Sequence, residues 1–175
     1  MRFHETKVPG LIEVLTAPSG DLRGRFLRTW CAEEFTAAGL DFRPHQTSIS
    51  ENRARHTLRG MHWQAAPAEE RKLVRCLRGA AFDVAVDLRP DSPAYLHWVG
   101  VELRAELHNA LLIPAGCAHG FLTLTDDAWL EYMIDAPYVA DAGRGARWDD
   151  PAFGIAWPAA PAVISDRDAQ WPDHA

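Results

Sequence analysis

The chain has 175 residues, of which 47% are hydrophobic, and its formal net charge at pH 7 is −6. This length suits one domain with a sizeable core, and the acidic balance argues against general nucleic-acid binding. No apolar run is long enough to span a membrane, and the N-terminus lacks the hydrophobic middle of a secretory signal. Cys31, Cys76 and Cys117 form no disulfide framework, so we expect free thiols in a soluble, cytoplasmic protein.

Short strands dominate the expected structure, and helix signals are few. In chain order, the sequence predicts a short helix at 31–39, ended by Gly39, and then strands at 57–64, 72–78, 81–88, 98–103, 110–113, 120–124 and 128–134. Turns with Pro and Gly, Asp or Ser are expected at 89–93 and 112–116. This pattern is typical of an all-β sandwich or barrel, whose lumen can hold a ligand.

The segment 81–88, AFDVAVDL, shows the clearest alternation. Apolar residues stand at every second position, and Asp83, Ala85 and Asp87 stand between them. A period of two predicts a half-buried strand with its aspartates on the polar face.

The segment 57–64, TLRGMHWQ, carries strongly polar side chains in an expected strand. His62 and Gln64 share one face, whereas Arg59 is out of phase with His62. Gly60 between them indicates a bulge that could re-aim one of the two. Polar residues that face a lumen would make this composition reasonable.

Five titratable residues are expected on inward faces of the strands: Arg59, His62, Lys72, His119 and Tyr132. Each alone is more often a structural residue than a catalyst. Together, among apolar neighbours that shift pKa values, they indicate acid–base chemistry. We interpret the charge run 69–72 as a mostly solvated turn from which only Lys72 contributes.

Metal chemistry is one open alternative. The segment 113–119, IPAGCAH, resembles the second metal motif of cupin proteins, and His62 with Glu69 or Glu70 resembles the first. Two histidines and a carboxylate could bind iron or manganese. Gln64 stands where a working cupin site normally has a second histidine, which weakens this alternative.

Proton abstraction next to a carbonyl uses every member of the set without a metal. His62 would be the base, Lys72 would hold the enolate charge, and Tyr132 would return a proton from the other side. A sugar-binding protein without catalysis is a third alternative, but a binder has no obvious use for an opposed base and acid.

The chain resembles the dTDP-4-dehydrorhamnose 3,5-epimerase family from about residue 3 to 172. The resemblance is carried by 5–14, 20–26, 57–64, 72–93, 113–124, 144–158 and 164–172, with motifs such as TLRGMHWQ, IPAGCAHGFLTL and ISDRDAQWP. It implies a single cupin-type jelly-roll domain over 1–175 and a homodimer. The expected reaction is epimerisation of a nucleotide-diphosphate-linked 4-keto-6-deoxyhexose next to the ketone, with no metal and no cofactor.

The resemblance also implies residue roles. Asp168 would orient the base His62, and Arg59 and His119 would hold the sugar and diphosphate. Further substrate contacts would be Arg23, Phe26, Gln46, Ser48, Tyr138 and Arg167. The N-terminal 20 or so residues could cross to a partner subunit, and 140–175 would close the site.

Three places depart from the family pattern. Arg28 and Gly143 stand where the family usually has Glu, and Thr47 and Ser48 replace Asp and Asn. These places contact nucleotide or sugar in the family, and an arginine cannot make the hydrogen bonds of a carboxylate. The sequence therefore predicts retained chemistry with altered substrate recognition, and leaves open which nucleotide is bound and whether C3, C5 or both are inverted.

Overall fold

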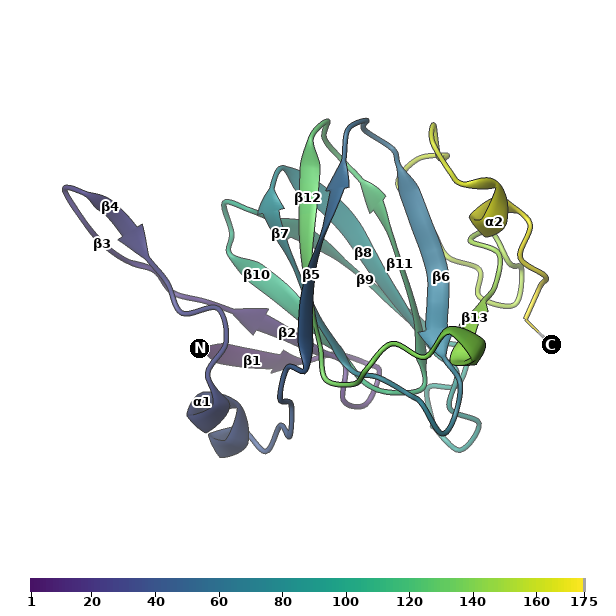
Figure 1. The fold of residues 1–175 in the computed structure, drawn as a ribbon, viewed down its shortest axis with the longest axis horizontal. Coiled ribbons are helices and arrows are strands. Elements are labelled where there is room, and N and C mark those ends of the chain that lie inside the picture. Colours follow the sequence, from purple (N-terminus) through teal and green to yellow (C-terminus); the bar gives the residue numbers. More distant parts are fainter. Residues whose placement is uncertain (175) are drawn as a thin grey trace.

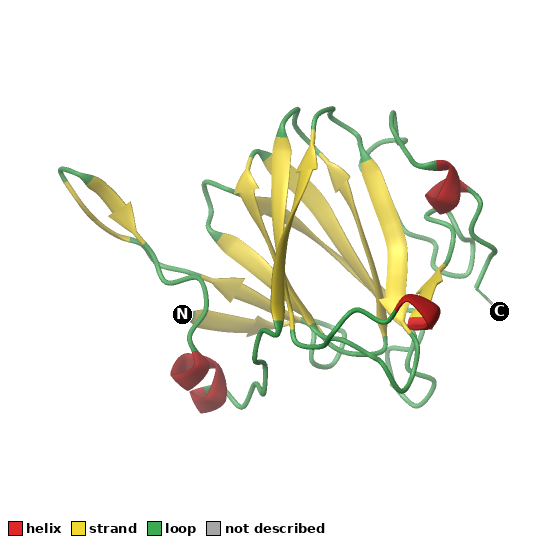
Figure 2. Cartoon of the chain, in the orientation of Figure 1, coloured by secondary structure: helices red, strands yellow, loops and turns green. Residues whose placement is uncertain are grey.

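The computed structural model describes residues 1–174, which form two facing antiparallel sheets (Figures 1 and 2). One sheet has the order β1 (Arg2–Glu5), β2 (Ile12–Leu15), β10 (Asn109–Ile113), β7 (Lys72–Arg78), β12 (Ala128–Ile134) and β5 (Gln46–Asn52). The other has the order β13 (Gly143–Gly145), β6 (Leu58–Gln64), β11 (Cys117–Thr123), β8 (Ala80–Asp87) and β9 (Trp98–Arg104). The expected all-β, cupin-type jelly roll is confirmed.

A third, two-stranded sheet stands clear of the sandwich. Its strands are β3 (Ser19–Asp21) and β4 (Gly24–Phe26), and they project from the body as a hairpin at the left of Figure 1. The helical elements are α1 (Ala32–Ala37), η1 (Ala140–Ala142) and α2 (Asp166–Ala169). In residues 1–174 there is no helix long and apolar enough to cross a membrane.

Most local predictions match the structure. The strands expected at 72–78 and 128–134 have those bounds. The expected helix ends as predicted, because Gly39 adopts a positive φ of 74° and its N–H donates to the Thr36 carbonyl. The strand expected at 120–124 begins earlier, at Cys117, because residues 117–119 continue the ladder with β8.

Three apolar clusters stabilise this arrangement. Phe121, Leu111 and Leu130 belong to the cluster between the two sheets, and each is fully buried. On the far side of the six-stranded sheet, Leu73 packs with Phe35 of α1. On the far side of the five-stranded sheet, the C-terminal segment covers β8 in a cluster that includes Val84, Val86, Ala146 and Phe153. Each sheet is therefore covered in part on its outer face as well.

The half-buried prediction for 81–88 is wrong. Asp83 and Asp87 are fully buried, and their face looks between the sheets, where Ala81 and Ala85 also pack. The apolar face points outward and is covered by the C-terminal segment, a partner that the local pattern cannot reveal. Buried carboxylates need partners, and Asp87 receives hydrogen bonds from Arg89 and Ser92, which fix the 89–93 turn.

Gly60 forms the expected irregularity in β6. His62 pairs with His119, and Arg59 pairs with Phe121. Between these pairs, Gly60 and Met61 on β6 face the single residue Gly120 on β11. This is the geometry of a β-bulge, and it brings Arg59 and His62 to the same cavity. The φ of Gly60 is 135°, and an added Cβ would lie 2.5 Å from the Gly120 Cα.

We predict that Gly60→Ala destabilises the fold and removes activity. A side chain at this φ is strained, and the Cβ meets backbone that cannot swing away, so we expect a loss above about 2 kcal/mol. Gly154→Ala is the control, because Gly154 also has positive φ, at 57°, but nothing lies within 4 Å of an added Cβ. Urea unfolding of both variants measures the difference, and equal losses would contradict the contact argument.

Candidate active site

A cavity of about 330 Å³ opens between the two sheets. Its lining contains Ser48, Ile49, Ser50, Arg59, His62, Lys72, His119, Tyr132 and Asp168. His62 comes from β6 and His119 from β11 in the five-stranded sheet, whereas Tyr132 and Lys72 come from β12 and β7 in the other. The fold therefore gathers all five titratable residues expected on inward faces, and it brings the imidazole and the phenol from opposite walls.

His62 is held by a carboxylate from the C-terminal segment. Its Nε2 lies 2.7 Å from the Asp168 Oδ1, and the N–H of Gly60 donates to the other carboxylate oxygen at 3.2 Å. Ser165 caps the short helix α2 by accepting from the Asp168 N–H, which fixes where this carboxylate points. In the neutral imidazole, Nε2–H donates to Asp168, which leaves the lone pair on Nδ1.

Asp168 remains ionised beside this imidazole. Burial alone would raise its pKa, but the hydrogen bond and charge of His62 and the Gly60 N–H outweigh burial. The pKa of Asp168 therefore lies below its ordinary value. A fixed negative charge at this position would stabilise an imidazolium at His62.

Tyr132 is a phenol that keeps its proton. Although the side chain borders the cavity, burial raises the pKa of Tyr132 well above its ordinary value, and the nearby charge of Asp83 acts in the same direction. Arg59 opposes this more weakly. The His119 ring packs edge-on against Tyr132 at 5.7 Å, and His119 Nε2 lies 2.8 Å from the Asp83 Oδ1.

Lys72 brings its ammonium to the cavity from the start of β7. Its Nζ lies 2.9 Å from the Glu70 Oε1, and both side chains are about nine-tenths buried. The interpretation of 69–72 as a mostly solvated turn is therefore wrong for Glu70. Its carboxylate is drawn inside because both oxygens have partners, with Lys72 on one and Gln64 on the other.

A second hollow, of about 160 Å³, shares His62 and Lys72 with the cavity. Tyr138, Arg144 and Arg167 also line it. Tyr138 is 65% exposed, and the Arg167 guanidinium lies 5.0 Å from the centre of the Trp171 ring. An open aromatic face beside two guanidinium groups is suited to a nucleoside with phosphate groups.

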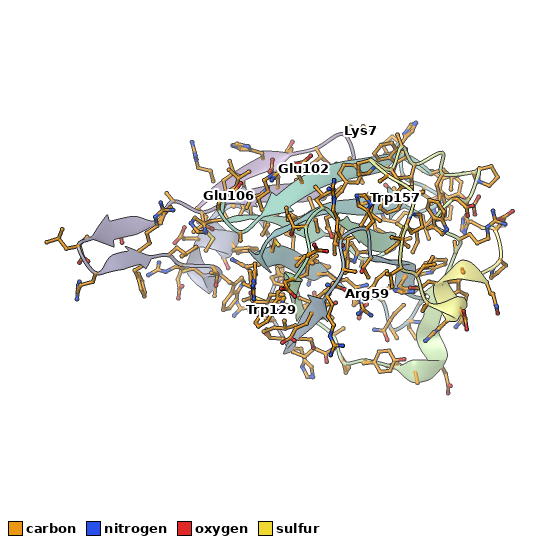
Figure 3. The ribbon with its side chains drawn as sticks, turned by 90° about the horizontal axis from the view of Figure 1, so that it is seen from above. Lys7, Arg59, Glu102, Glu106, Trp129 and Trp157 are labelled. Atoms are coloured by element: carbon orange, nitrogen blue, oxygen red, sulfur yellow. The ribbon has the colours of Figure 1, made fainter. Side chains whose placement is uncertain are left out.

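Three predicted substrate contacts line neither the cavity nor the second hollow of their own chain. Arg23 and Phe26 are on the projecting hairpin, where Arg23 pairs with Asp21 in solvent. Figure 3 shows this hairpin far from Arg59 in a perpendicular view. Gln46 is the first residue of β5, and its side-chain amide donates to the Ala136 carbonyl. The hollow lined by residues 19–26, about 450 Å³, contains no base opposed to an acid.

The metal alternative finds no support in the geometry. Within residues 1–174, no three His, Cys, Asp or Glu side chains gather as a metal site. His62 pairs with Asp168, His119 pairs with Asp83, and Glu70 pairs with Lys72, so the three proposed ligands face separate partners. Glu69 is exposed.

Arg28, one of the departures from the family pattern, has a partner within the chain. Its Nη1 lies 3.1 Å from the Glu34 Oε1, and the other oxygen of Glu34 pairs with the N-terminal amine. This cluster fixes the base of the hairpin to α1. Gly143 lines the second hollow. Ser48, on β5, lines the cavity and is the cross-strand partner of Tyr132 on β12.

Sequence reasoning missed Asp83 and assigned Glu70 only to the metal alternative. The signal for Asp83 was present, because its same-face neighbours Ala81 and Ala85 are small enough to leave room for a buried carboxylate and its partner. Glu70 carried no such signal. Glu70 lies in the loop between β6 and β7, and its burial depends on a hydrogen bond from Gln64, the last residue of β6.

Fold and site together define a cupin-like protein with an imidazole and a phenol on opposite walls of one cavity. The family model for dTDP-4-dehydrorhamnose 3,5-epimerase matches residues 5–175. The dTDP-4-dehydrorhamnose 3,5-epimerase of Sinorhizobium fredii is 45% identical over 154 residues, which cover 87% of this chain and 79% of the relative.

Two solved structures extend the comparison. The Bacillus anthracis dTDP-4-dehydrorhamnose 3,5-epimerase, with TDP and PPi bound, has a TM-score of 0.96 at 34% identity and covers 99% of both chains. The Legionella pneumophila enzyme, in complex with dTDP-4-keto-L-rhamnose, has a TM-score of 0.92 at 33% identity, covering 98% of this chain and 92% of its own. The chain belongs to the dTDP-4-dehydrorhamnose 3,5-epimerase family.

We predict that the Tyr132 phenol stays protonated between about pH 9 and 11, where an ordinary phenol, with a pKa near about 10, ionises. Because burial raises the pKa of Tyr132, Tyr132→Phe should leave the absorbance change of the folded protein at 295 nm over this range unaltered. The same comparison in urea-unfolded protein is the control, and there Tyr132→Phe should remove part of the change. An equal loss in folded and unfolded protein would contradict a raised pKa for Tyr132.

Proposed function

We propose that the chain epimerises a dTDP-linked 4-keto-6-deoxyhexose at C3 and C5, the carbons next to the C4 ketone. His62 Nδ1 takes the proton from the carbon, the electrons of the C–H bond form a C=C bond, and the C4 oxygen becomes an enolate. The Lys72 ammonium stabilises this oxygen. Tyr132 then donates its proton to the opposite face, the enolate collapses to the ketone, and the carbon is inverted.

One observation carries this proposal: a base held by a carboxylate and a protonated phenol line one cavity from opposite sheets, with an ammonium on the same lining. Inversion requires a base and an acid on the two faces of the carbon. Between turnovers, His62 must lose its proton and Tyr132 must regain one. The His62 side chain is 40% exposed, so water can exchange with it.

Each step has a side chain to perform it, so we propose that no metal and no organic cofactor takes part. Asp168 orients His62, while Arg59 and His119 contact the sugar and the diphosphate. The three cysteines are free thiols, which fits the cytoplasm, where we propose that the enzyme works.

The second hollow is the proposed nucleotide subsite. Tyr138 would stack on the base, and Arg144 and Arg167 would face the diphosphate. Because this hollow shares His62 and Lys72 with the cavity, the sugar of a bound nucleotide would reach the catalytic groups.

We further propose a homodimer in which each hairpin completes the site of the partner. Arg23 and Phe26 are exposed on a hairpin that leaves its own sandwich. Phe26 is 78% exposed, and a large apolar side chain at that position favours burial against another surface. Arg23 would then bring a further cation to the partner's diphosphate.

We predict that the enzyme incorporates deuterium from heavy water at C3 and C5 of dTDP-4-keto-6-deoxyglucose. His62→Ala should slow this exchange by a factor of about 10² to 10⁴, the usual contribution of a positioned base. His97→Ala replaces an exposed histidine outside the site and should exchange normally. Mass spectrometry and proton NMR locate the label. If the unmodified enzyme incorporates no deuterium, the proposed reaction is contradicted.

We predict that two inactive variants complement one another in a mixed dimer. An Arg23→Ala chain has an intact cavity, and a His62→Ala chain has an intact hairpin, so each mixed dimer contains one complete site. Random mixing should recover about a quarter of normal activity, since half of the dimers are mixed and each has one working site of two. The two unmixed variants serve as controls. If mixing the two variants recovers no activity, the proposal that each hairpin completes the partner's site is wrong.

A further inference from the structure

Gln64 occupies an unusual position between the two subsites. It is the last residue of β6, 4% exposed, and its side chain reaches both the Lys72 ion pair and the segment that carries Tyr138. The proposed reaction gives it no role. Its contacts nevertheless connect the residue that would stack on the base with the residue that would hold the enolate.

One end of this connection is the backbone on both sides of Tyr138. The Gln64 Oε1 accepts from the Val139 N–H at 2.7 Å, and the Gln64 Nε2 donates to the Pro137 carbonyl at 3.2 Å. A single amide therefore clamps the peptide groups before and after Tyr138. The Tyr138 side chain itself stays exposed in the second hollow.

The other end is the Lys72 ammonium. The same Nε2 of Gln64 donates to the Glu70 Oε2 at 2.9 Å, and the Glu70 Oε1 lies 2.9 Å from the Lys72 Nζ. The Gln64 Nε2 also donates to the Ala68 carbonyl at 3.0 Å. Two N–H groups thus serve three acceptors, so a shift of the Pro137 carbonyl redistributes the bonds that hold Glu70.

We propose that Gln64 and Glu70 are positioning residues that couple Tyr138 to Lys72, so that a nucleotide seated on Tyr138 sets the ammonium where the enolate oxygen forms. The proposal rests on the proposed function and deepens it. Binding energy from the nucleotide, remote from the reacting carbon, is then used in the transition state. Two states of a shared hydrogen-bond network can carry such coupling between sites.

The kinetic test separates turnover from binding. With Gln64 present, Tyr138→Ala should lower kcat about tenfold as well as raise KM, an effect within the usual range for coupled sites. In a Gln64→Met background, which keeps an unbranched side chain of similar size without hydrogen bonds, Tyr138→Ala should raise KM and change kcat less than twofold. An equal kcat loss in both backgrounds, or no kcat loss in either, overturns the coupling.

Two further variants keep this test decisive. Asn109→Leu removes a buried amide with three hydrogen bonds on β10, to Glu13, Arg104 and the Glu102 carbonyl, away from the cavity. It controls for lost stability, and in its background the tenfold effect of Tyr138→Ala should persist. Should Gln64→Met fail to fold, Glu70→Gln removes the carboxylate that joins Gln64 to Lys72 and should also confine the Tyr138→Ala effect to KM.

A second readout needs no catalysis. The chain has two lysines, Lys7 and Lys72. Lys7, which is labelled in Figure 3, serves as an internal reference, and its Nζ lies 5.5 Å from the centre of the Trp98 ring. In protein labelled with ¹³Cε-lysine, saturating dTDP should shift the Lys72 signal, and Gln64→Met should reduce that shift by at least half. The same shift with and without Gln64 refutes the coupling. Absent deuterium exchange by the unmodified enzyme instead refutes the proposed reaction alone.

Discussion

The hydrogen bond between His62 and Asp168 joins two parts of the chain that are 106 residues apart, and the site depends on it. Its donor stands on the five-stranded sheet, and its acceptor arrives on the C-terminal segment, which packs over the outer face of the same sheet. The apolar face of β8 therefore contributes indirectly to the site, because it packs against the C-terminal part of the chain. The segment that delivers the carboxylate is also attached to β6, where the Leu58 N–H donates to the Val163 carbonyl at 2.8 Å.

The orientation of β8 also explains why polar side chains lie between the sheets. With its apolar face outward under the C-terminal segment, the strand presents Asp83 to the space between the sheets, where a carboxylate persists only with a partner. His119 supplies that partner and packs against Tyr132. Burial raises the pKa of Tyr132, and the nearby negative charge of Asp83 acts in the same direction, so the phenol keeps the proton that an acid needs.

Local sequence patterns predict the strands well and the environment of each strand poorly. The bounds of β7 and β12 and the bulge at Gly60 follow from periodicity and from the properties of glycine. The half-buried reading of β8 fails because periodicity reports two unlike faces but not which face a later segment covers. The charge run 69–72 indicates a solvated turn because local charge does not reveal that Gln64 and Lys72 both bind the Glu70 carboxylate. The hairpin with Arg23 and Phe26 was matched by resemblance, yet its separation from the sandwich is visible only in three dimensions.

The departures from the family pattern lie on different elements from the chemistry. His62, Lys72, His119 and Tyr132 stand on interior strands of the two sheets, where a substitution disturbs neighbours on both sides. Arg28 lies at the base of the hairpin, Thr47 and Ser48 lie on the edge strand β5, and Gly143 lies on the edge strand β13. Edge strands and hairpins accept new side chains at low cost in stability, and Arg28 satisfies its charge with Glu34. Side chains at these positions can therefore change in this fold while His62, Tyr132 and Lys72 stay in place.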